Sequence, residues 1–528
     1  MRVARSAGRQ PAQRFVPAID WLWVALAGVA QAASLAWPWG GQPLWWLQVL
    51  SLGLLARIVL RAPTGRRAAA LGWLFATAWL SGTFWWLFIS MHTYGGLAAP
   101  LAVLAVVGLA AFLGSYYAVA LGCFRTLALK NRALAAIVFA AFWLLAELAR
   151  GVWWTGFPWG AGGYAHVDGP LAVLARSVGV YGIGFVAAVL AMGAAQGRMA
   201  DLRRPRTWGA LALVGAGWAG LYAQRHCAVE LCHTPMQPPA TLSLALLQGN
   251  IPQDEKFQPG SGVPVALQWY DEQLKAATAA LVVAPETAIP LLPQQLPPGY
   301  LESLTAHYAR GGQAALVGIP LGNRDQGYTN SVIGLAPGQA APYRYDKHHL
   351  VPFGEFIPPF FRWFTEMMNI PLGDFNRGGI GQRSLAWQGQ RIAPNICYED
   401  LFGEEIGANF IDPAQAPTVL VNFSNIGWFG DSLAIDQHLS ISRMRALEFE
   451  RPMVRATNTG ATAVIDHRGV VTHRLAQHTR GVLLADVAGR DGGVTPFAWW
   501  VSRYALWPLW ALGGVIVAVA VWLRRRAG

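Results

Sequence analysis

A nearly continuous run of apolar residues from 16 to 223 constrains the fold of this chain more than any other feature of its sequence. The hydrocarbon core of a bilayer is about 30 Å thick, and a helix of about 20 apolar residues spans it. Eight apolar stretches approach that length, and two of them are short. We therefore predict eight transmembrane helices, near residues 16–37, 43–60, 68–88, 97–121, 133–149, 171–195, 208–222 and 504–523.

The basic residues alternate between the connections of these stretches, and this pattern predicts how the chain is oriented. The two termini and the connections after the second, fourth and sixth stretches together hold 18 Lys and Arg residues. The short connections between them hold one, Arg150. Because Lys and Arg beside a span are retained on the cytoplasmic side, we expect both termini in the cytoplasm. The segment between the seventh and eighth spans should then lie outside.

The formal net charge of +12 is confined to the membrane part of the chain. Outside residues 225–503 the chain holds 20 Lys and Arg against four acidic residues, Asp20, Glu147, Asp168 and Asp201. The segment in between holds 20 basic and 24 acidic residues and is slightly negative. A basic surface is the electrostatic mark of nucleic-acid binding, so the sequence argues against nucleic acid as a partner.

A cleavable signal peptide is the alternative interpretation of the amino-terminal stretch. Ala30-Gln31-Ala32 resembles a cleavage site that follows an apolar run. However, the apolar run continues to Trp37, and further spans follow it. These features favour a first span that stays in the mature protein.

Residues 225–500 have the pattern of a globular α/β domain between two membrane parts, 1–224 and 501–528. Short apolar runs rich in β-forming residues alternate there with helical patterns, as is typical of α/β folds. Helices fit residues 265–280 and 437–449. The expected strands are 242–247, 281–284, 315–319, 331–335, 392–397, 419–423, 453–456, 463–465 and 482–485.

Several common catalytic motifs are absent from the sequence. None of the four lysines, Lys130, Lys256, Lys275 and Lys347, follows a glycine, so there is no Walker-type phosphate loop. The chain also has no H-E-x-x-H, C-x-x-C or G-x-S-x-G motif. We therefore expect no metal ion and no cofactor.

Three segments place a reactive side chain directly after a strand, where the end of a sheet opens to a cleft. They end at Glu286, Lys347 and Cys397. A carboxylate can accept a thiol proton, and an ammonium can stabilise a thiolate and an oxyanion. A thiolate can attack an acyl carbon. Together the three side chains predict acyl transfer.

Each of these residues also has an ordinary interpretation. Cysteine is commonly a small buried apolar residue, and Glu286 and Lys347 could be surface charges. A catalytic role for Lys347 is favoured because the chain uses 36 Arg against 4 Lys, which suggests that this position needs a compact point charge. His348 and His349 offer a rival Cys-His pair for Cys397, and sequence spacing does not decide between the two arrangements.

The residues around these positions carry a resemblance to a known family. Pro285-Glu286, Tyr345-Asp-Lys347 and Cys397-Tyr-Glu399 resemble the Glu-Lys-Cys site of the nitrilase, or carbon-nitrogen hydrolase, superfamily. With its flanking spans, the whole chain resembles the bacterial apolipoprotein N-acyltransferases. Further similar segments begin at Gln248, His349, Asn422, Arg443 and Arg455. One departure is Ile426, where many members carry an acidic residue.

The resemblance implies an αββα sandwich outside the membrane and a role for each reactive residue. Glu286 would be the base, Lys347 the oxyanion stabiliser and Cys397 the nucleophile. Glu355 is similar to the family's second glutamate, which supports the lysine and the intermediate. Four more residues are implied, with structural packing as the alternative: Tyr398 and Glu399 beside the nucleophile, Asn330 near the pocket and Arg377 on a loop.

The implied reaction transfers a fatty acyl chain from a membrane phospholipid to a diacylglyceryl-modified apolipoprotein, at its N-terminal amino group, through a thioester on Cys397. The enzyme would be a monomer in the bacterial inner membrane, with its catalytic domain on the periplasmic side. A membrane-tethered amidase, in which water resolves the thioester, is one alternative. A transporter is another, because Asp20, Glu147 and Arg176 lie in or beside the spans. No inverted repeat supports a transporter.

The connection from 351 to 375 is unusually aromatic. It contains Phe353, Phe356, Phe360, Phe361, Trp363 and Phe364. Aromatic side chains are enriched where protein meets the bilayer surface, so this connection fits an interfacial lid. Packing in the domain core is the alternative.

Cys227 and Cys232 lie just outside the seventh predicted span. A compartment outside the cytoplasm permits disulfides, so a small bridge between them is possible. Cys397 should stay a free thiol, because its proposed chemistry requires a thiolate.

Overall fold

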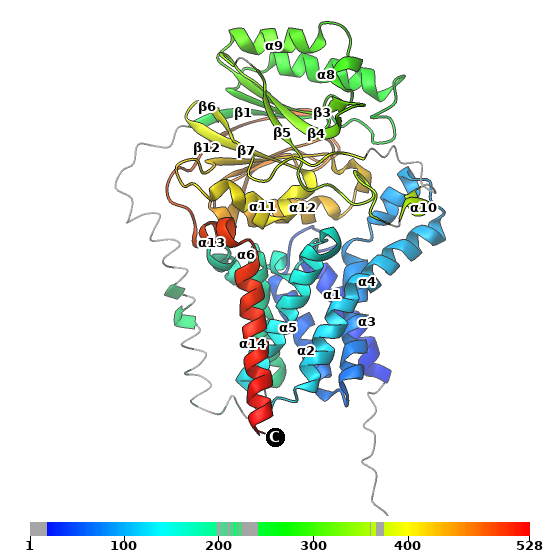
Figure 1. Cartoon of the computed structure of the whole chain (residues 1–528), viewed down its shortest axis with the longest axis vertical. Coiled ribbons are helices and arrows are strands. Elements are labelled where there is room, and N and C mark those ends of the chain that lie inside the picture. The colour runs from blue at the N-terminus through cyan, green and yellow to red at the C-terminus, as the bar shows by residue number, and fades with distance from the viewer. Residues whose placement is uncertain are drawn as a thin grey trace, which may run out of the picture.

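The computed structural model describes residues 18–197, 241–339, 341–359, 361–365 and 374–527, together with scattered positions between 201 and 223. A bundle of long helices and a sandwich of β-sheets are stacked along the long axis of the molecule (Figure 1). The predicted seventh span, 208–222, falls largely outside the described residues, and Cys227 and Cys232 lie outside them entirely.

The described helices of the bundle are α1 (Ala18–Leu35), α2 (Trp45–Arg61), α3 (Gly65–Thr83), α4 (Ala99–Thr126), α5 (Arg132–Val152), α6 (Ala175–Gln196) and α14 (Trp507–Ala527). Five segments in the described part of the chain are long and apolar enough to cross a membrane: Ala18–Leu35, Ala99–Thr126, Arg132–Thr155, Pro170–Gln196 and Trp507–Arg526. Helix α2 has 17 residues and α3 has Arg66 and Arg67 in its first turn, and neither helix is among the five. Five spans are therefore supported, while the number eight stays a prediction.

Local sequence signals set the ends of these helices. Thr64 accepts a hydrogen bond from the Arg67 N–H (3.2 Å), and Asn131 accepts one from the Leu134 N–H (3.0 Å). These side-chain caps begin α3 and α5. The predicted stretch 68–88 extends beyond the helix, because α3 ends at Thr83; a π-helical segment, Ile89–Tyr94, follows the stretch.

The other half of the molecule contains two six-stranded sheets, in the orders β12-β1-β2-β3-β4-β5 and β11-β10-β9-β8-β7-β6. The strands are β1 (Thr241–Gln248), β2 (Leu281–Ala284), β3 (Ala314–Asn323), β4 (Gly327–Leu335), β5 (Tyr343–Asp346), β6 (Leu385–Trp387), β7 (Gln390–Ile396), β8 (Val419–Ser424), β9 (Met453–Thr457), β10 (Ala463–Ile465), β11 (Val471–Arg474) and β12 (Gly481–Ala488). Strands β1, β2 and β3 are parallel to one another, as are β7, β8 and β9. Within each set the carboxyl ends therefore point the same way.

Alternating side chains along the strands build the layers of this half. In β1, Leu242, Leu244 and Leu246 pack between the two sheets, whereas Ala245 and Leu247 pack under helices. Helices α8 (Gly262–Ala276) and α9 (Tyr300–Arg310) cover the outer face of the first sheet. Helices α11 (Gly403–Gly407) and α12 (Ala434–Phe449) cover the second sheet on the side of the bundle (Figure 1). This layering confirms the expected αββα sandwich.

Helix α12 joins the sandwich to the helical bundle. The side-chain oxygen of Gln437 accepts hydrogen bonds from the indole N–H groups of Trp86 (3.1 Å) and Trp159 (2.8 Å). Its side-chain nitrogen donates to the Thr83 carbonyl oxygen (3.0 Å). All four residues are buried. Helix α12 therefore holds the second sheet directly on the helical half.

Candidate active site

The three reactive residues lie directly after strands, as the sequence predicts. Glu286 follows β2 with one residue between, Lys347 follows β5 and Cys397 follows β7. The first two strands belong to one sheet and β7 belongs to the other. The N–H of Asn425, directly after β8, donates to Glu286 Oε2 (2.8 Å) and so connects the two sheets at this point.

A buried cluster of two carboxylates and one ammonium forms the centre of the site. Lys347 Nζ lies 3.3 Å from Glu286 Oε1 and 2.9 Å from Glu355 Oε1. The Asn330 Nδ2 amide lies 2.7 Å from the same oxygen of each carboxylate. The side chain of Lys347 is 1% exposed. The structure therefore brings together four residues that the sequence predicts for the site.

The charges in this cluster favour the ionised forms of both partners. Burial alone would raise the pKa of Glu286, but Lys347, Asn330 and the Asn425 N–H together hold that pKa below its ordinary value. Burial alone would lower the pKa of Lys347, but Glu355 and Glu286 raise it above its ordinary value. At neutral pH the cluster therefore holds a carboxylate next to a permanent ammonium.

Cys397 is held in an uncommon backbone conformation, with a φ of +53°. Residues other than glycine adopt this left-handed region at a cost, and such residues are enriched at functional sites. Two side chains fix the turn through the Cys397 carbonyl oxygen: Asn422 Nδ2 at 3.1 Å and His438 Nε2 at 3.2 Å. The Ser424 hydroxyl donates to Cys397 Sγ (3.5 Å). As a whole residue, Cys397 is partly exposed.

Cys397 is a thiol at rest. Burial raises its pKa to about 12, and the negative charge of Glu286 adds to this shift, whereas Lys347 and the Ser424 hydroxyl oppose it. The charges of Glu286 and Lys347 thus both act on the sulfur. Because the resting pair is a thiol and a carboxylate, an attack by this sulfur would require a base.

The two histidines next to Lys347 have other partners. His348 Nδ1 lies 2.7 Å from the Gly378 carbonyl oxygen. His349 lies between Glu405 Oε1 (2.8 Å) and the Thr155 carbonyl oxygen (3.0 Å). In the part of the chain that the structure describes, no histidine is hydrogen-bonded to Cys397 Sγ. The charge of Glu286 acts on this sulfur, whereas neither His348 nor His349 is among the groups that shift its pKa.

Glu399 is hydrogen-bonded to both loops that carry Cys397 and Lys347. Its carboxylate accepts hydrogen bonds from the Ile396 N–H (2.6 Å), the His348 N–H (2.6 Å) and the Tyr345 hydroxyl (2.8 Å). Burial raises the pKa of Glu399 to about 7, although these hydrogen bonds and the charge of Lys347 oppose the shift. Glu399 therefore positions the backbone on which Cys397 and Lys347 lie.

Tyr398 and Arg377 lie at the margins of the cluster. The Tyr398 hydroxyl donates to the Gly156 carbonyl oxygen (3.1 Å), which belongs to the helical half. Arg377 is exposed and donates a hydrogen bond to the His348 carbonyl oxygen (3.3 Å). Its Cζ atom lies over the Phe356 ring, 5.1 Å from the ring centroid. In the described part of the chain, neither of these two side chains is hydrogen-bonded to Glu286, Lys347 or Cys397.

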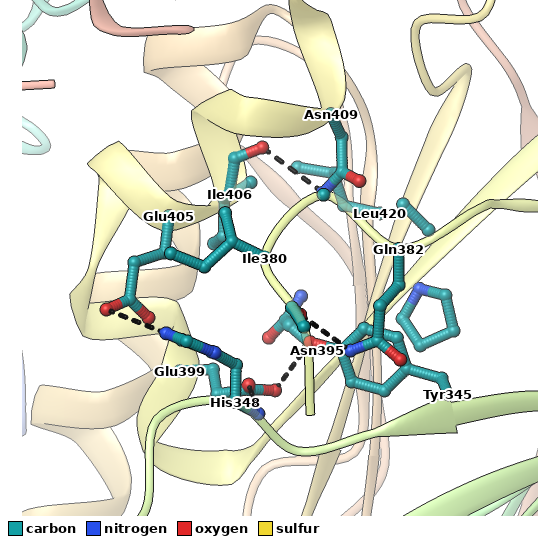
Figure 2. A pocket seen from close by; sticks show the side chains of 14 residues that line it. Tyr345, His348, Ile380, Gln382, Asn395, Glu399, Glu405, Ile406, Asn409 and Leu420 are labelled. Atoms are coloured by element: carbon teal, nitrogen blue, oxygen red, sulfur yellow. Dashed lines mark hydrogen bonds and ion pairs between the residues drawn. The ribbon is translucent and has the colours of Figure 1, made fainter. Parts of the chain in front are cut away.

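A small cavity of about 20 Å³ borders the site on the side of β7 (Figure 2). His348 and Glu405 point toward each other there, with 4.0 Å between Nε2 and Oε1. Asn395 Nδ2 and Glu405 Oε2 have no hydrogen-bond partner among the described residues. The volume suits about one water molecule. Among the described side chains, no group of three or more His, Cys, Asp or Glu could hold a metal ion.

The sequence reasoning missed several residues of the site. Asn422, Ser424 and Asn425 lie at the carboxyl end of β8, the same signal that points to Glu286 and Cys397. Lys256 is buried beside Glu286, with Nζ 3.1 Å from the Glu286 carbonyl oxygen. Lysine is scarce in this chain, and the argument that this scarcity favours a functional role for Lys347 applies equally to Lys256.

The aromatic connection is only partly described. Phe360 lies outside the described residues, as does the side chain of Phe364. Phe361 and Trp363 are 44% and 60% exposed. The Phe353 and Phe361 rings meet edge to face, with 5.5 Å between centroids. The interfacial lid remains a prediction.

Comparison with known proteins accounts for both halves of the chain. Residues 27–193 match the family model of the apolipoprotein N-acyltransferase N-terminal domain, and residues 243–494 match that of carbon-nitrogen hydrolase. The second match agrees with the two sheets and their covering helices. A solved carbon-nitrogen hydrolase from Helicobacter pylori is 15% identical, covers 51% of this chain and 94% of its own, and has a TM-score of 0.35.

Two curated relatives match over nearly the full length. An apolipoprotein N-acyltransferase of Verminephrobacter eiseniae is 67% identical over 511 residues, which cover 93% of this chain and 95% of that protein. One of Ralstonia nicotianae is 46% identical and covers 92% and 90%. These matches confirm the resemblance seen in the sequence, and they make the chain an acyltransferase rather than a transporter. The chain belongs to the apolipoprotein N-acyltransferase family.

Proposed function

We propose that this enzyme transfers a fatty acyl chain from a membrane phospholipid to the N-terminal amino group of a diacylglyceryl-cysteine apolipoprotein. One observation carries the proposal: the thiol of Cys397, a partly exposed residue directly after a strand, is acted on by the charges of the buried Glu286 and Lys347. Glu286, Lys347 and Cys397 are the proposed catalytic residues, and no cofactor is required. Glu355, Asn330 and Glu399 position them, and Tyr398 and Arg377 have supporting roles at the margin.

In the first step, Cys397 Sγ attacks the ester carbonyl carbon of the phospholipid. Its proton passes to Glu286, and the N–H groups of Lys347 stabilise the oxyanion that forms. The carbon-oxygen bond of the ester then breaks, and Glu286 returns the proton to the departing glycerol oxygen. A lysophospholipid leaves, and the acyl chain remains as a thioester on Cys397.

In the second step, the neutral amine of the apolipoprotein attacks the thioester carbon. Glu286 accepts a proton from this amine, and Lys347 again stabilises the oxyanion. The carbon-sulfur bond breaks, an amide is formed, and the proton on Glu286 returns to the sulfur. Removal of an oxyanion stabiliser typically costs about 3 kcal/mol of transition-state stabilisation, which is the size of the role proposed for Lys347.

The proposed setting is the bacterial inner membrane, with the catalytic domain periplasmic, both termini cytoplasmic and the enzyme a monomer. We propose eight spans and three parts: residues 1–224, 225–500 and 501–528. The family matches at 27–193 and 243–494 support this division. The three charges in or beside the spans have partners: Asp20 pairs with Arg61 (3.4 Å), Glu147 accepts the Gly162 N–H (2.9 Å), and Arg176 pairs with Glu450 of the sandwich (2.7 Å). Such pairs suit a structural role for these charges.

Transfer of a label from lipid to peptide tests the function. Purified full-length enzyme in detergent micelles is mixed with phospholipid labelled in its acyl chain. We expect one labelled chain per enzyme, sensitive to hydroxylamine and located on Cys397 by mass spectrometry. A diacylglyceryl-cysteine peptide with a free N-terminus should then take the label as an amide, whereas the N-acetylated peptide should leave it on the enzyme.

The same experiment distinguishes the amidase alternative. A site that opens to lipid should admit a lipid-anchored amine and keep bulk water from the thioester. The acyl-enzyme should therefore persist until the peptide is added. If free fatty acid is released at the same rate with and without peptide, the enzyme is a hydrolase and the proposed transfer is contradicted.

Reporter fusions test the proposed orientation. A reporter that is active only outside the cytoplasm should be active when fused after Gly260 and silent after Thr64, because 18 of 19 basic residues in the connections fall on one side. Each fusion is compared with one at the same position to a reporter that is active only in the cytoplasm. Activity of the outside reporter after Thr64, with silence after Gly260, would reverse the orientation.

A further inference from the structure

A second buried lysine lies beside the proposed base. Lys256 is 2% exposed, and its Nζ lies 3.1 Å from the main-chain carbonyl oxygen of Glu286. Lys347 holds the carboxylate of the same residue, 3.3 Å away. Glu286 therefore has one ammonium at its side chain and another at its backbone.

The chain forms a tight turn that places Lys256 in the wall of the site. The Lys256 N–H donates to the Pro252 carbonyl oxygen (2.9 Å). Gly262 packs so closely on this turn that a Cβ there would overlap the Glu255 carbonyl oxygen. Gln253, in the same turn, accepts a hydrogen bond from Asn425 Nδ2 (2.9 Å). Because the Asn425 N–H binds Glu286, the turn and the base belong to one connected structure.

The ammonium of Lys256 is buried, and it has no direct ion pair with any residue that the structure describes. Among the described residues, its contacts are the Glu286 carbonyl oxygen and the ring of Phe257, 5.8 Å from Nζ. Burial lowers the pKa of Lys256 to about 7, although the charges of Glu286 and Cys397 oppose this shift. Burying a charge without a paired partner is costly. A lysine kept at such a position is a candidate for function.

The charge balance of the site indicates what this ammonium does. Two carboxylates, Glu286 and Glu355, face Lys347, and the Lys256 charge acts on Glu286 and on Cys397. With Lys256 charged, the cluster is neutral overall. Transfer of the Cys397 proton to Glu286 moves negative charge to the sulfur without changing this sum. Without Lys256, one buried negative charge would be uncompensated throughout the reaction.

We propose that Lys256 is a positioning residue whose positive charge keeps Glu286 ionised and in place, and so permits the thiolate of Cys397 to form. This inference rests on the proposed roles of Glu286 and Cys397. It requires the charge of Lys256 and not only its bulk or its hydrogen bond.

Alkylation of Cys397 by iodoacetamide, followed from pH 5 to 10 by peptide mass spectrometry, tests the inference without any lipid. The full-length enzyme in detergent is compared with Lys256→Met, Lys256→Gln and Lys256→Arg. The Gln variant keeps a hydrogen-bond donor, and the Arg variant keeps the charge. Lys275→Met is the matched control, since it removes a lysine charge from the surface of α8, where Lys275 pairs with Asp271 (2.7 Å). The exposed Cys123 reports reagent reactivity in every sample.

Both neutral variants should alkylate Cys397 about tenfold more slowly below about pH 7, where wild-type Lys256 keeps its proton, so that the rise in rate is shifted upward in this range. Above about pH 7 the difference from wild type should narrow, because Lys256 loses its charge there. Loss of a positive charge destabilises both the Glu286 carboxylate and the Cys397 thiolate, so a higher pH is needed to form the thiolate. A unit charge several ångströms away has an effect of this size in a partly screened site. Below about pH 7 Lys256→Arg should keep the wild-type pH dependence, and Lys275→Met should be unchanged at every pH.

An unshifted pH dependence in either folded neutral variant would overturn the inference, as would an equal shift in Lys256→Arg. Thermal unfolding of each variant identifies those that fold. If a Glu286→Gln variant alkylates like wild type, Glu286 is not the base for Cys397, and the inference about Lys256 is overturned as well. If the expected shifts occur but wild-type enzyme forms no thioester with phospholipid, the proposed function fails and the inference stands.

Discussion

Replacing Cys397 with alanine is expected to abolish both the labelled acyl-enzyme and amide formation on the peptide. The proposed mechanism stores the acyl chain on this sulfur, so no other group can carry it between the two substrates. Loss of a catalytic nucleophile typically lowers turnover by about 10⁴-fold or more. The measurement is the labelled-phospholipid reaction in detergent, with the protein band and the peptide product quantified separately.

The matched control for this substitution is Cys123→Ala. Cys123 is exposed near the end of α4, far in sequence from the strand ends of the site. Its removal should leave both label transfer and the acyl-enzyme unchanged. The fold of the Cys397→Ala enzyme should also be unchanged in thermal unfolding, since only a sulfur atom is lost. A hydroxylamine-sensitive label that persists on Cys397→Ala would place the thioester elsewhere and contradict the assignment.

Replacing Glu286 with glutamine is expected to slow thioester formation by about 10³-fold, within the range that general bases contribute. The resting thiol of Cys397 has a pKa of about 12, so attack requires a group that takes the proton. Glutamine keeps the size of the side chain and can still meet Asn330, but it cannot accept that proton. Single-turnover formation of the labelled acyl-enzyme measures this step alone.

Substitutions of His348 and His349 by alanine provide the comparison. Each should lower thioester formation by less than about tenfold, because neither histidine is hydrogen-bonded to the Cys397 sulfur among the described residues. His349 links the sandwich to Thr155, so thermal unfolding must be followed as well. If a folded histidine variant loses the acyl-enzyme while Glu286→Gln retains it, the Cys-His pair is the correct mechanism.

The sequence predicts the strands that are buried and apolar, but it misses both edge strands of the second sheet. β6 and β11 are the two edge strands of the second sheet, and neither is among the expected strands. β11 reads Val-Thr-His-Arg and is largely exposed. An edge strand has only one neighbour and needs few apolar side chains, so its pattern resembles that of a loop. Helix α9 is missed too, since it buries only Leu304 and Tyr308.

By itself, the sequence determined the division into an apolar helical part and an α/β domain, and it placed Glu286, Lys347 and Cys397 after strands. These properties are local, because hydropathy, alternation and the position of a residue after a strand are read along the chain. Only the tertiary structure decided which side chains meet. Lys256 joins the site from 30 residues before Glu286, and Glu399 braces a loop 51 residues before it. His348 and His349 turn to other partners. Hydrogen bonds and charges act through space, so the electrostatics of the cluster emerges only when strand ends from two sheets meet.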